Sequence, residues 1–231
     1  MSSLTSLGWL GIVRLGLIQA ALGAIVVLTT STMNRVMVVE FALPAMLPGA
    51  LVALHHAIQM SRPRFGYGSD VGGRRTPWII GGMLVLALGG VTASLGTALM
   101  GADVFWGTAT ALLGFIMIGL GVGACGTSLL VFLAKRVDAG RRAAAATIVW
   151  VMMIVGFAVT AGMAGHFLDP FSPQRLVVVT SVVALIAVLV TVLAMRNLEG
   201  EGVQHPPADT SDSTRKTPFR TALAEVWREQ E

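Results

Sequence analysis

The sequence contains few charged residues and few groups suited to redox or disulfide chemistry. Only 12% of its 231 residues are charged, and Cys125 is its one cysteine. A single cysteine excludes an intrachain disulfide and gives no support for a thiolate metal site. We also find no nucleophile–base pair, no metal-ligand spacing and no phosphate-binding glycine loop. These absences indicate a chain that is not an enzyme and holds no metal.

Apolar residues dominate what is present. They make up 55% of the chain, and the mean hydropathy is +0.77. A soluble protein of this length could not bury so much apolar surface in one core. Repeated, continuous apolar runs of about 20 residues predict an all-α polytopic membrane protein. We expect six transmembrane helices in a bundle over residues 1–196, at 7–33, 41–60, 77–99, 104–133, 143–165 and 176–195.

The composition changes after the sixth predicted span. Residues 197–216 are polar and contain Gly, Pro, Ser and Thr, which predicts a disordered cytoplasmic linker. Within 217–231, Phe219, Leu223 and Trp227 recur at every fourth position. This spacing predicts an amphipathic cytoplasmic helix on the membrane surface, with packing on a partner protein as the alternative.

The basic residues predict the orientation in the membrane. Most of the 16 Lys and Arg residues lie in 62–75, in 135–142 or after residue 195. If the predicted spans are correct, these three segments share one face. The positive-inside rule makes that face cytoplasmic and places both termini there. Because topology accounts for the basic residues, we expect no nucleic-acid partner.

Polar side chains within membrane spans are costly and for that reason often functional. The second to sixth predicted spans have no Asp or Glu at mid-membrane depth, which argues against an ion-coupled transporter of polar solutes. The candidate cavity residues belong to the first span and the connection after it: Arg14, Gln19, Asn34, Arg35 and Glu40. Arg14 either extends to the headgroups or faces a polar cavity or an anionic ligand group. Arg35 and Glu40 are close enough in sequence to form an ion pair.

Two histidines and several glycines suggest contacts inside the bundle. His55 and His56 each either hydrogen-bond near the interface or ligate the magnesium of a chlorophyll through a neutral imidazole. Adjacent helical residues point about 100° apart, so at most one of them faces a given partner. Gly119 and Gly123, at i and i+4, and Gly162 predict close helix packing. A surface for a flat ligand is the alternative.

The loop between the second and third spans carries the most specific motif. Gly66, Asp70, Gly73, Arg74 and Arg75 match a pattern of Gly, three residues, Asp, a basic residue, any residue, Gly and two basic residues. Val71 departs from it, standing where a basic residue is usual. The loop resembles that of the major facilitator superfamily. The resemblance implies a conformational latch, in which Asp70 accepts charge-assisted hydrogen bonds from a helix N-terminus or an arginine.

A longer resemblance covers most of the chain. Residues 7–17, 29–40, 42–60, 62–82 and 217–231 resemble the bacteriochlorophyll-delivery branch of that superfamily, the PucC-like and LhaA-like light-harvesting assembly proteins. It implies the N-terminal half of a twelve-span protein, completed by missing sequence or by another chain.

The same resemblance implies a function and a location. We expect assembly of light-harvesting complexes, either by delivery of bacteriochlorophyll or by chaperoning of LH1 or LH2 antenna subunits. The implied partners are the lipid bilayer and antenna or reaction-centre subunits, in the bacterial inner (intracytoplasmic) membrane. Two alternatives stay open: a secondary transporter of a small hydrophobic solute, and a structural subunit of a photosynthetic membrane complex.

Overall fold

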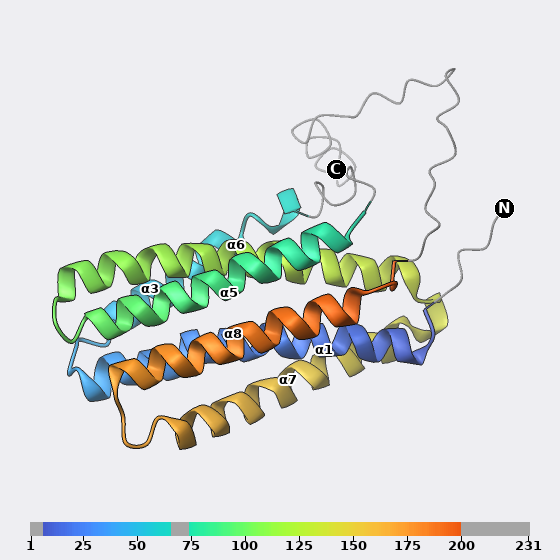
Figure 1. Ribbon diagram of the computed structural model, residues 1–231. Helices are drawn as coiled ribbons and strands as arrows, with labels where there is room; N and C mark the ends of the chain where they lie inside the picture. The colour runs from blue at the N-terminus through green and yellow to red at the C-terminus, as the bar shows by residue number, and fades with distance from the viewer. Residues whose placement is uncertain (1–6, 66–73, 200–231) are drawn as a thin grey trace.

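The computed structural model describes residues 7–65 and 74–199, and every regular element in this part of the chain is a helix. The helices form an elongated bundle (Figure 1). Five of them are long and apolar enough to cross a membrane: Trp9–Glu40, Thr76–Leu99, Val104–Arg136, Ala139–Phe167 and Pro173–Met195. The prediction of an all-α polytopic membrane protein is confirmed. The predicted helix at 217–231 and all but the first residues of the predicted linker at 197–216 lie outside the described residues.

The first crossing is longer than predicted and contains two π-helical turns. It is built from α1 (Trp9–Val27), η1 (Leu28–Thr32), α2 (Met33–Arg35) and η2 (Val36–Glu40). The hydroxyls of Thr29 and Thr30 donate to the Val26 carbonyl, at 2.9 and 2.8 Å, where the wider π turn alters the backbone pairing. Because η2 ends at Glu40, the helix continues seven residues beyond residue 33, the predicted end of the first span. The polar residues after residue 33 belong to this helix.

The helix at the second predicted span is shorter than expected. We expected a span at 41–60, whereas α3 covers Met46–Gln59, 14 residues, which is about 21 Å of helix against a hydrocarbon core of about 30 Å. Ala42 has a φ of 52°, and Pro44 supplies no backbone N–H donor to a helix. These residues keep 41–45 out of the helix, so α3 is not among the five long helices.

Two glycine rows bring α5 (Thr76–Leu99) and α6 (Val104–Arg136) into backbone contact. A Cβ added at Gly89 would lie 2.8 Å from the Ile118 nitrogen, and one at Gly121 would lie 2.5 Å from the Leu86 nitrogen. Spacing of seven residues keeps the same face of each helix against its neighbour. The antiparallel pair runs side by side in Figure 1. The two rows are Gly82, Gly89 and Gly96 on α5, and Gly107, Gly114 and Gly121 on α6.

The last two crossings are less embedded in the bundle. The short η3 (Ala139–Arg141) precedes α7 (Arg142–Phe167), and α8 (Pro173–Met195) follows. Helix α7 packs mainly on α1, where a Cβ at Gly156 would lie 2.7 Å from the Ala20 carbonyl oxygen. Helix α8 packs on α1 and α5. Figure 1 shows α7 at the edge of the bundle, next to α8 and α1.

Most of the described basic residues gather at one end of this bundle. The Leu7 nitrogen donates to the Arg136 carbonyl at 2.8 Å, which joins the start of α1 to the end of α6. Arg14 donates to the Arg196 carbonyl, which adds the end of α8. This common basic end agrees with the predicted loop arrangement. Which membrane face it occupies stays a prediction.

Candidate functional site

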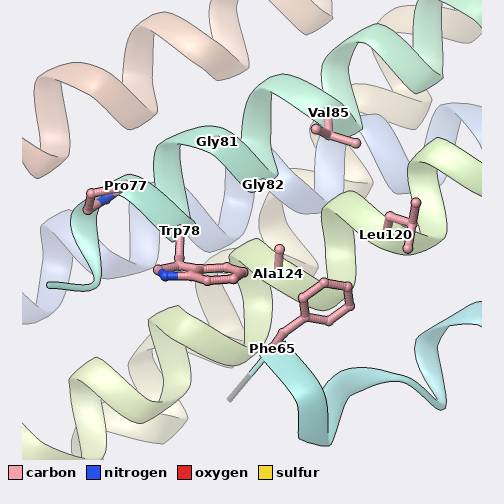
Figure 2. A pocket seen from close by; sticks show the side chains of 8 residues that line it. All are labelled: Phe65, Pro77, Trp78, Gly81, Gly82, Val85, Leu120 and Ala124. Carbon is pink, nitrogen blue, oxygen red and sulfur yellow. The ribbon is translucent and has the colours of Figure 1, made fainter. Parts of the chain in front are cut away.

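An apolar pocket of about 390 Å³ opens between α5 and α6 near the basic end. Figure 2 shows the Trp78 indole and the Phe65 ring directed into the space between these helices. Their ring centroids are 6.4 Å apart at an interplanar angle of 63°. A Cβ at Gly81 would meet no atom within 4 Å, so this glycine leaves the pocket open. The remaining lining residues are Pro77, Gly82, Val85, Leu120 and Ala124.

The chemistry of this pocket is that of an apolar receptor. None of its eight lining side chains is charged or titratable. Its volume falls in the range of small-molecule sites, about 300–1,000 Å³. Two aromatic rings and a glycine surface suit a flat or aliphatic group held by dispersion and by release of water. The pocket supplies no side chain to coordinate a metal.

The two predicted histidine ligands lie beside this pocket's helices but not in its lining. His55 is 1% exposed, its Nε2 is 2.6 Å from the Gln59 Nε2, and its Nδ1 has no hydrogen-bond partner in the described part of the chain. His56 is exposed. Access to a magnesium ion therefore differs between the two rings, and only His56 presents its imidazole to the surroundings.

The predicted packing glycines fall into two groups. A Cβ at Gly119 would lie 2.9 Å from the His55 carbonyl oxygen, and one at Gly123 would lie 2.9 Å from the Phe65 ring. Gly119 thus seats α3 on α6 beside His55, whereas Gly123 receives the Phe65 ring from the segment after α3. A Cβ at Gly162 would meet nothing within 4 Å. The helix contact expected at Gly162 is therefore not made within residues 7–65 and 74–199.

The five candidate cavity residues do not form one cavity. Gln19 is buried and donates to the Met153 sulfur at 3.3 Å, between α1 and α7. Arg14 lies at the basic end, whereas Asn34 is 20 residues further along, about 30 Å away on a helix. The predicted ion pair exists near the far end, with 3.6 Å between Arg35 Nη2 and Glu40 Oε1.

A polar junction at the basic end involves a residue that sequence reasoning missed. The Glu199 carboxylate accepts hydrogen bonds from the backbone N–H groups of Arg75 and Thr76, at 2.7 and 3.1 Å, and from the Thr76 hydroxyl. Arg136 Nη1 donates to the Glu199 carbonyl at 3.1 Å. Beside them lies a cavity of about 760 Å³ that Arg74 and Arg196 help to line. Glu199 thus ties the end of α8 to the ends of α5 and α6.

The environment of Glu199 favours its charged form. Burial by itself raises the pKa of the carboxyl, but the hydrogen bonds from Thr76 and Arg75 and the charge of Arg74 lower it, and the pKa is below its ordinary value. Backbone N–H groups at a helix start are the usual partners of a capping carboxylate. The residue was overlooked because it follows the last apolar run, where the composition indicated a linker.

The predicted loop motif is described only in part. Arg74 and Arg75 stand at the start of α5, whereas Gly66, Asp70 and Gly73 lie outside the described residues. The start of α5 is where the resemblance implied a latch. The described acceptor at this helix start is Glu199.

Comparison with known proteins identifies relatives over most of the chain. The sequence pattern of the family described as PUCC protein matches residues 32–231. The "Bacteriochlorophyll synthase 44.5 kDa chain" of Rhodobacter capsulatus is 52% identical over 227 residues, which are 97% of this chain and 51% of that protein. "Protein PucC" of Cereibacter sphaeroides is 30% identical over 203 residues, 81% of this chain and 44% of that protein. The chain spans about half the length of the curated relatives it matches.

The first of these relatives corrects one expectation. From the absence of catalytic motifs we predicted that the chain is not an enzyme, whereas the relative from Rhodobacter capsulatus carries the name of a bacteriochlorophyll synthase chain, which is an enzyme name. Missing motifs were a weak basis, because the prediction used only patterns of residues close together in sequence. The family match covers far more than half of the chain. The chain belongs to the PUCC protein family.

Proposed function

We propose that this chain acts in the assembly of light-harvesting complexes in a photosynthetic membrane. In this proposal it delivers bacteriochlorophyll to antenna subunits or chaperones those subunits. The observation that carries the proposal is the PUCC family match over residues 32–231, together with a relative named for bacteriochlorophyll. The pigment is treated as cargo of the protein.

The apolar pocket between α5 and α6 is the proposed contact for part of the pigment. Trp78 and Phe65 offer ring faces and edges, and Gly81 leaves room beside them. Such a lining suits the apolar portion of a tetrapyrrole but supplies no magnesium ligand. The exposed imidazole of His56 is the proposed candidate for that role, and buried His55 is the less accessible one.

The wider architecture is part of the proposal. The chain would form the N-terminal half of a major-facilitator-type bundle, with a second half in missing sequence or in another chain. Relatives about twice as long support this. The basic end would face the cytoplasm, in keeping with the positive-inside rule. The junction at Glu199 would then hold that end of the half together beside the loop motif.

The test is purification from native phototrophic membranes in mild detergent, followed by an absorption spectrum and identification of co-purifying subunits. We expect bacteriochlorophyll absorbance, co-purifying antenna or reaction-centre subunits, or both. If the protein binds them only transiently, fewer than one pigment or subunit should be recovered per protein chain. A fixed stoichiometry within a mature complex would favour a structural subunit. Recovery of the protein without pigment and without any such subunit would refute the proposal.

A further inference from the structure

A second apolar groove, of about 330 Å³, is lined by residues of α1, α7 and α8. Its floor is made of small residues on α1, and its walls are branched side chains of α7 and α8. Representative lining residues are Ala20, Ala24, Gly156, Val159, Val182 and Ile186. The packing of α7 mainly on α1, with little contact to α8, leaves this space.

A polar pocket continues the groove at the end of the bundle opposite the basic end. This pocket has a volume of about 510 Å³ and shares Phe167 and Val179 with the groove. Asp169 and Arg175 place one acidic and one basic side chain in its lining, and His166 and Gln174 complete the polar set. Arg175 Nη1 donates to the Pro170 carbonyl at 2.8 Å, which holds the guanidinium beside the loop.

The length of the groove matches one leaflet of a bilayer. On α7 it runs from Phe167 back to Gly156, and on α8 from Val179 to Val190. Eleven residues of helix rise about 16 Å, and half of the hydrocarbon core is about 15 Å. The polar pocket stands where α7 ends and α8 begins, which is where helices that span a bilayer reach its headgroups. The groove therefore extends from the headgroup region to the middle of the membrane.

We propose that the groove and the polar pocket bind one phospholipid with a zwitterionic, amine-bearing headgroup. One acyl chain occupies the groove, the phosphate faces Arg175, and the ammonium group faces Asp169. The side chains of opposite charge match the two charges of this headgroup. Apolar contact in the groove and charge complementarity at its mouth act together.

The chemistry at its mouth favours a lipid as the occupant of the groove, because the pocket that continues it carries both Asp169 and Arg175. An extended hydrocarbon chain is thin enough to lie between α7 and α8. The proposal does not depend on pigment handling, because its residues are separate from the pocket lined by Trp78.

Native mass spectrometry of the purified chain tests this site. The chain is delipidated in detergent and offered equal amounts of phosphatidylethanolamine, phosphatidylcholine and phosphatidylglycerol. We expect a one-to-one complex with phosphatidylethanolamine to dominate. Asp169→Asn and Arg175→Gln should each weaken it roughly two- to fivefold, the range of an exposed charge contact.

A substitution that fills the groove tests the binding of the acyl chain separately from the binding of the headgroup. Ala24→Phe places a ring in the groove and should abolish the complex. Ala161→Phe is the matched control, because Ala161 is an exposed residue of α7 outside the groove lining. A monodisperse elution profile checks that each variant is folded.

Three results would overturn the proposal. They are equal retention of the three lipids, unchanged binding in Ala24→Phe, and unchanged binding in both charge variants. A photoreactive probe at Val182 adds an independent measurement in native membranes. Its crosslinking to a polypeptide instead of to lipid would assign the groove to a partner helix and refute a lipid site.

Discussion

The Glu199 carboxylate accepts a hydrogen bond from the Thr76 backbone N–H at 3.1 Å, although 123 residues separate the two in sequence. A helix start usually obtains such an acceptor from the residue immediately before it. Here the acceptor comes from the turn after α8, so one side chain completes the first turn of α5 and fixes the end of another helix. This relationship makes the basic end a single connected unit.

We expect Glu199→Ala to destabilise the protein by about 1–2 kcal/mol, as the loss of a capping side chain does. Thermal unfolding in detergent measures the change. Thr76→Val serves as the partner variant, because it removes the hydroxyl donor and keeps the backbone donor. If the two residues interact, the double variant loses less than the sum of the single losses. Strict additivity would contradict the pairing.

Acidification should weaken the same junction. The pKa of Glu199 is lower in the folded protein than its ordinary value, so its contribution is present above the unfolded pKa of about 4.3 and is lost as the pH falls through the folded pKa. The unfolding temperature of the parent protein should therefore fall more steeply below about pH 4.3 than that of Glu199→Gln. If the unfolding temperatures of the two proteins change in parallel with pH, the charged carboxylate does not contribute to stability in this way.

Gly121→Ala should be strongly destabilising. Its Cβ would lie 2.5 Å from the Leu86 nitrogen, so α5 and α6 must separate at a cost of about 1–3 kcal/mol. Gly162→Ala is the control, because its Cβ meets nothing within 4 Å and alanine favours a helix over glycine by up to about 1 kcal/mol. Unfolding midpoints should move in opposite directions. A similar loss in both variants would contradict the close approach of the two helices.

Arg14 should anchor the end of α8. Its Nη2 donates to the Arg196 carbonyl, and we expect Arg14→Gln to cost about 1 kcal/mol. Protease cleavage after Arg196 should become faster in this variant. Arg35→Gln is the comparison, since that side chain is 61% exposed and 3.6 Å from Glu40, a setting in which a salt bridge contributes little. Equal cleavage rates in the parent and Arg14→Gln would argue against the anchor.

The pocket between α5 and α6 can be tested apart from the rest of the proposed function. Gly81→Leu fills space that the structure leaves open, and Trp78→Ala removes one aromatic wall. Both should reduce pigment absorbance per chain by severalfold in purified material if pigment contacts this pocket. Gly49→Leu is the control, because its Cβ also meets nothing within 4 Å and it lies outside the pocket. Equal pigment content in all three variants would move the contact elsewhere.

Local properties of the sequence were sufficient to predict most helices but not their ends. The apolar runs predicted helices in six places, and the described part of the chain has a helix in each of them. They did not predict that the first helix continues to Glu40, because the polar side chains after residue 33 suggested a break. Nor did they predict the short α3, which depends on the backbone around Ala42 and Pro44. Polar residues indicate where a helix is in contact with water, and a helix can continue beyond that point.

The sequence contains a second glycine pattern besides the predicted i, i+4 pair. The i, i+4 spacing of Gly119 and Gly123 predicted close packing, and Gly119 seats α3 on α6 while Gly123 receives the Phe65 ring. The larger interface between α5 and α6 uses glycines that recur every seven residues on each helix. Gly89 belongs to the row on α5, and Gly114 belongs to the row on α6. That repeat is visible in the sequence once two neighbouring helices are compared. Which glycines face which helix still depends on how the helices are rotated.

Composition and the placement of charge were enough to predict the class of protein and the gathering of its basic residues at one end of the bundle. Apolar runs must form helices in a bilayer, because backbone groups there have no water to bond, and charged segments must lie outside the hydrocarbon. The packing of the helices in three dimensions determines that Glu199 caps α5, that Arg14 reaches Arg196, and that α7 and α8 leave a groove. The first two relationships join residues more than 100 positions apart, and all three arise from helix packing that no local pattern records.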